Sequence, residues 1–428
     1  MSLDAPVPNI GNHRPWLLRV RFQLLGGLFF AIILPALIRS SVDPGVLLSS
    51  NQQATMLATT VAHVLGFFAF RRLGNYPGIA AASYVLPTFV MSYGVVLLTI
   101  LFFRLDYSRF QAGGSFVLST LWYFSLSLAM RRLEPYRLAI IPGGNVDWVE
   151  KIGGVMWRRL ISPEDEISQI SGVVVDLRAD LSDEWERYIA DSALSGVPVY
   201  HVKQISESLT GRVEIEHLSE NTLGSLNPNH AYLKLKLLID WVAALLVLLI
   251  LSPLLLITAI AIRLDSKGPA MFRQERMGYG GQAFTVFKFR SMLIDTEEMG
   301  DEREKAITKI DDDRITALGR FLRKSRIDEL PQVLNILRGE MSWIGPRPEA
   351  VVLSKWYESE LPFYRYRHIV RPGITGWAQV NQGHVAAVVD VLGKLHYDFY
   401  YIKNFSPWLD VVIVLRTIKT IVTGFGAR

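Results

Sequence analysis

The feature that most constrains this chain is the length of its apolar runs. Four runs precede residue 131, and the longest of them exceeds the roughly 20 residues that a helix needs to cross a bilayer. They extend from Phe22 to Ile38, from Met56 to Phe70, from Ile79 to Phe103 and from Ser115 to Met130. The second and fourth are short for a span. We predict a four-helix transmembrane bundle in residues 1–132.

The distribution of arginine around these runs predicts their orientation. Cytoplasmic loops of membrane proteins are enriched in Lys and Arg. No cleavage pattern follows the first run, so we expect a retained anchor rather than a signal peptide. We also expect no ionisable side chain well inside a span, which argues against a transporter. Both ends of the bundle are predicted to be cytoplasmic, because basic residues flank them: Arg14, Arg19, Arg21, Arg71, Arg72, Arg131 and Arg132, against Arg39, Arg104 and Arg109 in the other loops.

Residues 133–230 have the pattern of a soluble α/β module. Short β-branched runs at 137–141, 172–176 and 197–201 alternate with helical stretches, which predicts a small parallel, Rossmann-like sheet. The first run ends in Gly143-Gly144, a turn that could cradle a phosphate. A glycine-rich turn alone is weak evidence for nucleotide binding. A regulatory or structural role is therefore favoured.

Residues 236–263 form a fifth apolar run that Ser252-Pro253 interrupts near its middle. Its flanks are basic on both sides, with Lys234 and Lys236 before it and Arg263 and Lys267 after it. Basic residues on both sides favour a helix that enters and leaves by one face of the membrane. Proline can bend a helix, and the serine hydroxyl could bond a freed carbonyl. The alternative is a kinked ordinary span.

The sequence after residue 263 is polar and rich in arginine. Arginine grips phosphate oxygens with a bidentate fork, and carboxylates beside such cations suit Mg²⁺. The chain has no cysteine, which excludes disulfides and thiolate metal sites, and its net charge of +5 suits anionic partners. Nucleic acid is not favoured, since the basic residues do not gather on one segment. The candidate phosphate-binding arginines are Arg273, Arg276, Arg290, Arg314, Arg320, Arg323 and Arg347, and the candidate carboxylates are Asp295, Glu297, Glu298, Asp313, Asp328 and Glu329.

Several motifs in this half occur in a known order. Lys288-Phe-Arg-Ser-Met292, Asp328-Glu-Leu-Pro-Gln332, Gly345-Pro-Arg-Pro348 and Gly376-Trp-Ala-Gln-Val-Asn381 follow one another. Together they resemble the bacterial sugar transferase family, the monotopic polyprenyl-phosphate phosphoglycosyl transferases that initiate exopolysaccharide, capsule and O-antigen synthesis. The resemblance covers about residues 232–428. It implies an α-rich catalytic domain in residues 231–428 with a re-entrant helix at 236–263, and a mainly α membrane protein as a whole.

The resemblance implies a ping-pong transfer of sugar 1-phosphate from a UDP-sugar to undecaprenyl phosphate, with release of UMP. The nucleophile of the family falls on Asp295, which Thr296, Glu297 and Glu298 follow. On a helix, Glu298 shares a face with Asp295, so we favour Asp295 and Glu298 over Glu297 as ligands of the cofactor Mg²⁺. The family's helix break falls on Ser252-Pro253. The implied substrate-binding residues are Lys288, Arg290, Arg347, Lys236 and Asp398, beside Arg273, Arg276 and Arg320. Lys236 keeps one cation of the Lys-Arg pair through which the family is expected to contact the lipid headgroup, and Leu237 stands in place of the other.

The resemblance places the chain in the bacterial inner membrane, as a multi-pass protein whose catalytic domain faces the cytosol. Its partners are then a UDP-sugar donor, undecaprenyl phosphate and membrane lipid. The sequence leaves the transferred sugar and homo-oligomerisation open. Two other readings are a transporter, which predicts polar residues and internal repeats in the spans, and a non-catalytic sensor, which predicts that Asp295 is dispensable.

Overall fold

The computed structural model describes residues 19–45, 49–73, 81–133, 137–165, 170–215, 228–293, 314–382 and 388–423. The chain forms two compact units, Met1–Gly211 and Arg212–Arg428. It is mostly helical, with several long apolar helices and a small parallel sheet, as predicted. The domain boundaries expected at 132/133 and 230/231 stay predictions.

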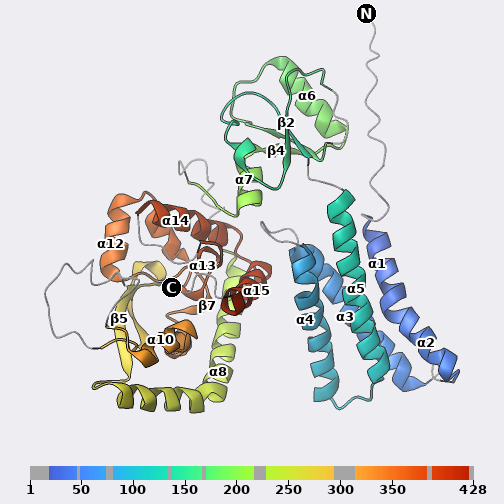
Figure 1. Ribbon diagram of the computed structural model, residues 1–428. Helices are drawn as coiled ribbons and strands as arrows, with labels where there is room; N and C mark the ends of the chain where they lie inside the picture. The colour runs from blue at the N-terminus through green and yellow to red at the C-terminus, as the bar shows by residue number, and fades with distance from the viewer. Residues whose placement is uncertain are drawn as a thin grey trace, which may run out of the picture. The chain divides into compact units, whose positions relative to one another are not determined.

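The first unit begins with helices that pack side by side (Figure 1). An unbroken helical segment, Val20–Val42, consists of α1 (Val20–Leu28), a π-helical turn η2 (Phe29–Ile33) and α2 (Leu34–Val42). Three more helices follow: α3 (Ser50–Leu73), α4 (Ala81–Phe102) and α5 (Arg109–Leu133). All four segments are long and apolar enough to cross a membrane.

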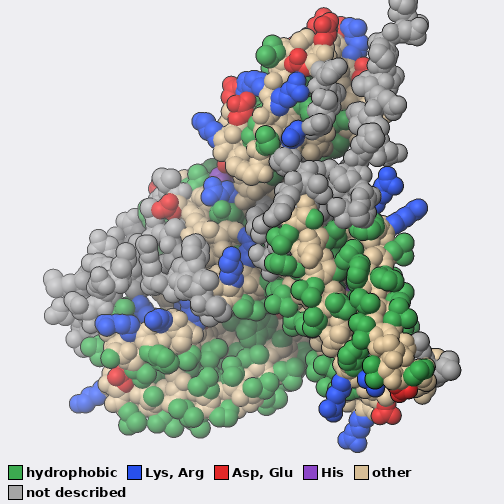
Figure 2. All heavy atoms as spheres, turned by 45° about the vertical axis from the view of Figure 1, so that its right-hand side comes forward, with side chains coloured by type: hydrophobic (Ala, Val, Ile, Leu, Met, Phe, Trp, Pro, Cys, Tyr) green, Lys and Arg blue, Asp and Glu red, His purple; other side chains and the backbone are tan. Residues whose placement is uncertain are grey.

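These N-terminal helices bury several polar side chains and expose many apolar ones. Gln52, Thr59 and Gln111 are buried beside an apolar cluster, whereas Leu57 and Phe68 are more than half exposed. Figure 2 shows hydrophobic side chains over the face of these helices that is in view. A soluble protein rarely exposes so many large apolar side chains together, so the chain is a membrane protein. The inner polar residues also explain why α3 and α5 are longer than the predicted runs.

The expectation that no ionisable residue lies inside a span is wrong for His63. This residue lies in the middle of α3 and is fully buried. Its Nδ1 lies 2.9 Å from the hydroxyl oxygen of Ser119, and its Nε2 lies 3.3 Å from that of Tyr123. Tyr93 also bonds Ser119, at 2.8 Å. Helices α3, α4 and α5 are therefore joined by a buried hydrogen-bond network as well as by apolar packing.

The predicted parallel sheet is confirmed. Its strand order is β2-β1-β3-β4, with β1 (Arg137–Ile140), β2 (Met156–Arg159), β3 (Gly172–Val175) and β4 (Val199–His201). Separate apolar clusters cover its two faces. The other elements are η4 (Val149–Lys151), α6 (Asp183–Leu194) and α7 (Val202–Thr210). Strand β2 was not predicted, because its sequence Met-Trp-Arg-Arg belongs to a largely exposed edge strand and has no apolar run.

The carboxylate of Asp176 lies against the glycine turn that follows β1. Asp176, which follows β3, accepts a hydrogen bond from the backbone N–H of Asn145 at 3.0 Å. A Cβ atom on Gly144 would lie 2.5 Å from the Asp176 carboxylate, so only glycine permits this approach. The Asp176 carboxylate thus accepts a backbone N–H of the turn that would otherwise be available to a phosphate. This arrangement favours a structural role for the turn.

The second unit begins with α8 (His230–Asp265), a single helix of 36 residues. Figure 1 shows that α8 is sharply bent, so that its two arms run in different directions. Pro253 lies inside the helix and has no N–H to offer the carbonyl of Leu249. The Ser252 hydroxyl donates to that carbonyl instead, at 2.9 Å. The bend and the serine hydrogen bond that the sequence predicts are therefore present in the helix, whereas re-entry into the membrane stays a prediction.

The rest of the second unit folds against α8. It comprises β5 (Met271–Met277), η6 (Tyr279–Gly281), β6 (Ala283–Phe289), α10 (Ala317–Lys324), η7 (Ile327–Gln332), α11 (Val333–Leu337), β7 (Ser342–Ile344), α12 (Val351–Glu360), η8 (Tyr364–Ile369), β8 (Gly373–Thr375), α13 (Trp377–Gln382), α14 (Val388–Lys403) and α15 (Pro407–Thr423). Strands β5 and β6 form an antiparallel hairpin, and β7 pairs with β8 in parallel. Two apolar clusters join these elements to α8.

Candidate active site

The β5–β6 hairpin carries the first predicted motif, and a buried asparagine fixes it to the second. Asn335, on α11, is fully buried. Its Oδ1 accepts from the backbone N–H of Phe287 at 3.1 Å, and its Nδ2 donates to the carbonyl of Thr285 at 2.7 Å. The side-chain amide of Asn335 thus forms the backbone hydrogen bonds that a neighbouring strand would otherwise form with β6. This connection places the Asp328-Glu329 pair of η7 beside Lys288.

Three cations, Lys288, Arg276 and Arg347, lie around Glu329. We call these four residues the cationic cluster. One carboxylate oxygen of Glu329 lies 3.1 Å from Lys288 Nζ and 2.7 Å from Arg347 Nη2. Arg276 donates to the carbonyl of Pro348, next to Arg347. All of these side chains are largely buried. Glu349 also acts on Arg276 and Arg347, but it is paired with Lys394. Among the described residues, three cations therefore face two carboxylates, Glu329 and Asp328, and a net positive charge remains.

The pKa shifts in this cluster follow from burial and from neighbouring charges. Burial lowers the pKa of Lys288 to about 8, against the opposing effect of Glu329. Burial alone would raise the pKa of Glu329, but Arg347 and Lys288 hold it well below its usual value. Burial and the charge of Glu329 raise the pKa of Asp328 to about 6. A buried site with surplus positive charge and perturbed groups is typical of anion binding.

Arg347 lies on a loop that close backbone contacts hold in place. The N–H of Gly345 donates to the carbonyl of Thr375 at 2.9 Å. A Cβ atom on Gly345 would lie 2.3 Å from the carbonyl oxygen of Arg371, and one on Gly376 would lie 2.2 Å from that of Gly345. The glycines of these two predicted motifs are therefore needed where the two loops touch. They shape the site indirectly, by fixing the backbone at Arg347.

A second buried network, centred on Arg367, holds the loop that carries Arg347. Arg367 donates to the backbone carbonyl of Arg347 at 2.9 Å and to the hydroxyl oxygen of Tyr364 at 2.6 Å. Its Nη2 also lies 2.9 Å from an oxygen of Asp398, an ion-pair distance without hydrogen-bond alignment. Glu349 pairs with Lys394. Burial alone would raise the pKa of Glu349, but Lys394 and Arg367 hold it below its usual range.

Asp295, Glu297, Glu298 and Asp313 lie outside the described residues, in the segment 294–313. The two described ends of this segment are joined. The N–H of Leu293 donates to the carbonyl of Arg314 at 2.8 Å, and Met292 bridges to Ile315. Within the described ranges, no group of three acidic or histidine side chains could hold a metal ion. The predicted Mg²⁺ ligands thus remain predictions.

The other predicted arginines lie in different surroundings. Arg290 is buried, and its guanidinium donates to the carbonyls of Ser266 and Lys267, at 2.7 and 3.1 Å. It therefore caps the C-terminal end of α8, where carbonyl groups lack helical partners. Arg273 and Arg320 are exposed. None of the three belongs to the cationic cluster.

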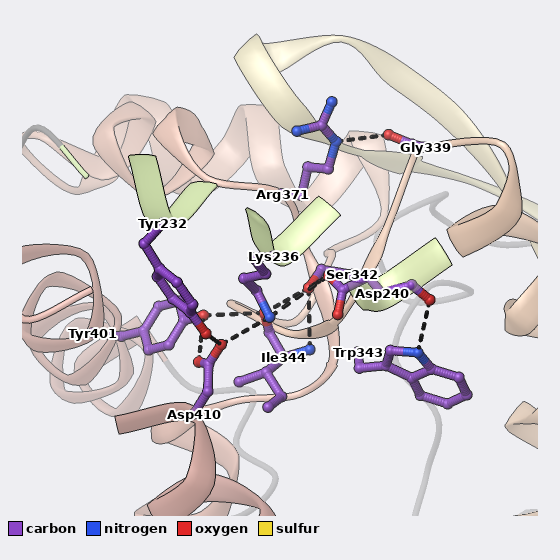
Figure 3. Close-up of polar contacts among 10 residues, drawn as sticks. All are labelled: Tyr232, Lys236, Asp240, Gly339, Ser342, Trp343, Ile344, Arg371, Tyr401 and Asp410. Carbon is purple, nitrogen blue, oxygen red and sulfur yellow. Dashed lines mark hydrogen bonds and ion pairs between the residues drawn. The ribbon is translucent and has the colours of Figure 1, made fainter. Parts of the chain in front are cut away.

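Lys236, predicted to contact a lipid headgroup, is instead buried among carboxylates (Figure 3). Its ammonium lies 2.9 Å from Asp410 and 3.6 Å from Asp240. Tyr232 and Tyr401 donate to Asp410, at 2.6 and 2.9 Å, and Ser342 donates to Asp240 at 2.6 Å. We call Lys236, Asp240 and Asp410 the anchor cluster, because it ties the first arm of α8 to β7 and α15. This position favours a structural role.

Sequence reasoning did not single out Arg367, Glu349 or Lys394. All three are buried and charged, and together they support the loop that carries Arg347. Lys394 lies one helical turn from Asp390 and from Asp398 on α14, so the sequence suggested local ion pairs instead. Nothing in the local pattern connects it to Glu349, 45 residues earlier.

Comparison with known proteins places these features in a family. The family model described as bacterial sugar transferase matches residues 231–424. The chain is 44% identical to the UDP-N-acetylgalactosamine-undecaprenyl-phosphate N-acetylgalactosaminephosphotransferase of Aeromonas hydrophila over 422 residues, which cover 97% of this chain and 99% of that protein.

Other relatives match a shorter part of the chain. The UDP-glucose:undecaprenyl-phosphate glucose-1-phosphate transferase of Xanthomonas campestris pv. campestris is 42% identical over 196 residues, 45% of this chain and 40% of that protein. The undecaprenyl-phosphate glucose phosphotransferase of Komagataeibacter xylinus is 44% identical over 185 residues, 42% of this chain and 34% of that protein. The match to the Aeromonas protein spans both units, and the family model matches the part that holds the cationic cluster. The chain therefore belongs to the bacterial sugar transferase family and is a transferase enzyme.

Proposed function

We propose that this enzyme transfers a sugar 1-phosphate from a UDP-sugar to undecaprenyl phosphate, the first membrane step of exopolysaccharide, capsule or O-antigen synthesis. The observation that carries the proposal is the cationic cluster. It presents Lys288 and Arg347 with a surplus of positive charge, as binding of a diphosphate requires. The relatives with named activities act on undecaprenyl phosphate.

The proposed chemistry has two displacements at one phosphorus atom. The Asp295 carboxylate attacks the sugar-proximal phosphorus, the bond to the bridging oxygen breaks, and UMP leaves. An oxygen of undecaprenyl phosphate then attacks the same phosphorus and releases the carboxylate, giving undecaprenyl-diphosphate-sugar. Lys288 and Arg347 hold phosphate oxygens through both steps. Mg²⁺, held by Asp295 and Glu298, would neutralise charge on the diphosphate.

We further propose that α8 is re-entrant, with the catalytic domain in the cytosol beside the inner membrane. Both arms of α8 pack on the same folded unit: Ala244 in the first arm against Val333, and Ile262 in the second against Phe289. A straight span would separate these attachments by the thickness of the membrane. The outer surface of α8 is apolar and exposed, as Figure 2 also shows, so it is suited to lipid.

The transfer is tested with purified full-length enzyme, undecaprenyl phosphate and radiolabelled UDP-sugars. UDP-N-acetylgalactosamine and UDP-glucose are tried first, because these sugars occur in the names of the relatives. UMP release and labelled lipid are expected from the wild type, and neither from Asp295→Asn. UMP release that survives in Asp295→Asn would exclude the proposed nucleophile. Glu298→Gln should raise the Mg²⁺ concentration required for activity more than Glu297→Gln does.

The topology is tested by cysteine labelling in cells, which the absence of native cysteine makes direct. Lys267→Cys places a thiol at an exposed position just after α8, and Asp106→Cys places one in the loop between α4 and α5. A membrane-impermeant maleimide should label Asp106→Cys in intact cells but Lys267→Cys only after lysis. Labelling of Lys267→Cys in intact cells would show that α8 crosses the membrane.

A further inference from the structure

A polar hollow opens at one end of the N-terminal helices, where α2 ends and α3 and α5 begin. Its volume is about 400 Å³, within the range of small-ligand sites. This end carries the loops with few basic residues, which the charge distribution places outside the cytoplasm. The lining includes Arg39 from α2, Gln52 from α3, and Tyr107, Ser108, Arg109 and Phe110 at the start of α5.

The charge of the hollow favours an anion. Arg39 and Arg109 line it, and no acidic residue does. Within the described parts of the chain, neither arginine forms an ion pair with a carboxylate. The first turns of α3 and α5 both border the hollow, and the N-terminal end of a helix carries partial positive charge. Two guanidinium groups and two helix starts suit a phosphate.

We infer that this hollow binds the headgroup of an anionic phospholipid, such as a phosphoglycerol headgroup. Arg39 and Arg109 grip the phosphate. The hollow lies at the helix ends, the depth at which headgroups lie when helices cross a bilayer. A soluble glycerol phosphate has the same chemistry, and the experiment separates the two sources.

The test is native mass spectrometry of the full-length protein in detergent, titrated with lipids that share the same acyl chains. Phosphatidylglycerol should bind about tenfold more tightly than zwitterionic phosphatidylcholine. The double variant Arg39→Gln/Arg109→Gln should abolish this preference. Arg104→Gln, which removes an arginine at the same end outside the hollow, should keep it.

Three results would overturn the assignment. They are equal binding of phosphatidylglycerol and phosphatidylcholine, a preference for phosphatidylglycerol that survives in the double variant, or a preference that Arg104→Gln removes equally. The last result would mean that general surface charge, rather than the hollow, attracts the lipid. Soluble glycerol 1-phosphate is tested as a competitor. If it displaces phosphatidylglycerol at millimolar concentration, the same site also takes the free phosphate. If it does not, the acyl chains contribute and the ligand is the lipid.

Discussion

The anchor cluster and the cationic cluster are both buried groups of charges in the second unit, yet they differ in balance. In the anchor cluster one cation, Lys236, faces two carboxylates, Asp240 and Asp410, and hydroxyl donors complete both carboxylates. In the cationic cluster the cations exceed the carboxylates, and among the described residues only Glu329 pairs directly with Lys288 and Arg347. In the first cluster, groups of the chain itself bond both carboxylates, whereas in the second the described residues leave positive charge without a carboxylate partner.

This difference separates a structural network from a binding site. Buried charges cost free energy unless they are paired and hydrogen-bonded. A cluster satisfied by its own chain stabilises one conformation, here the attachment of α8. A cluster that keeps surplus charge lowers the stability of the fold and is suited to bind an ion of opposite charge. The two clusters should therefore respond to mutation in different observables, stability for the first and substrate use for the second.

The largest effect is expected from Lys236→Met in the anchor cluster. It leaves two buried carboxylates without their cation, which should destabilise the second unit by about 3–5 kcal/mol. The measurement is the thermal midpoint of the detergent-solubilised protein. Lys234→Met is the matched control, because Lys234 is exposed two residues earlier on the same helix. It should change stability by less than about 0.5 kcal/mol.

The same variant distinguishes the structural role of Lys236 from the headgroup contact that the sequence motif predicts. Adding Asp240→Asn to Lys236→Met removes one of the stranded charges and should restore part of the lost stability. If Lys236→Met instead leaves the thermal midpoint unchanged and raises the KM for undecaprenyl phosphate, the headgroup prediction is correct. The anchor cluster would then resemble the cationic cluster in function.

Arg347→Met in the cationic cluster should lower kcat/KM for the UDP-sugar by about 10²–10³-fold, the usual cost of a lost charge-stabilising donor. Stability should change little, because Lys288 still neutralises Glu329. Arg273→Met is the control, since Arg273 is exposed on the same hairpin outside the cluster. Equal losses in the two variants would mean that overall charge, rather than the cluster, attracts the substrate.

The sequence predicted those features that depend on local pattern. The apolar runs became helices, and the Ser252 hydroxyl bonds the carbonyl that Pro253 leaves free. Strands β1, β3 and β4 appear where β-branched runs predicted them. The α3 and α5 helices extend beyond their apolar runs, because buried polar residues such as Gln52 and Gln111 face one another inside. A prediction from hydropathy ends the apolar run at such polar residues and assigns them to loops.

The pairing of charges could not be predicted, because it depends on contacts between distant parts of the chain. Lys288 and Glu329 are 41 positions apart, and Lys236 and Asp410 are much further apart. From sequence, Arg290 and Arg347 both looked like phosphate ligands. In the fold one caps a helix and the other joins the cationic cluster. Residue type indicated the chemistry, and tertiary position decided which residues are available for it.

A smaller effect is expected from Asp328→Asn, and it should be stabilising. The pKa of Asp328 is raised to about 6, mainly by burial, so folding favours its protonated form. The wild type should therefore lose stability as pH rises from about 4 to about 6, by roughly 2 kcal/mol in total. Asp328→Asn should remove this loss and raise the thermal midpoint at pH 7. A lower midpoint at pH 7 would mean that the ionised carboxylate stabilises the fold.

The smallest effect concerns Lys288 and pH. Its pKa is lowered to about 8, mainly by burial, so the amine loses its proton as pH rises through that value. The cationic cluster then loses one positive charge, and the KM for the UDP-sugar should rise a few-fold between pH 7 and pH 9. Lys288→Arg keeps its charge in this range and should flatten the rise. Lys355→Arg, an exposed substitution on α12, should leave it unchanged. An unaltered rise in Lys288→Arg would assign the pH dependence to another group, and the surplus charge of the cluster would then be independent of pH.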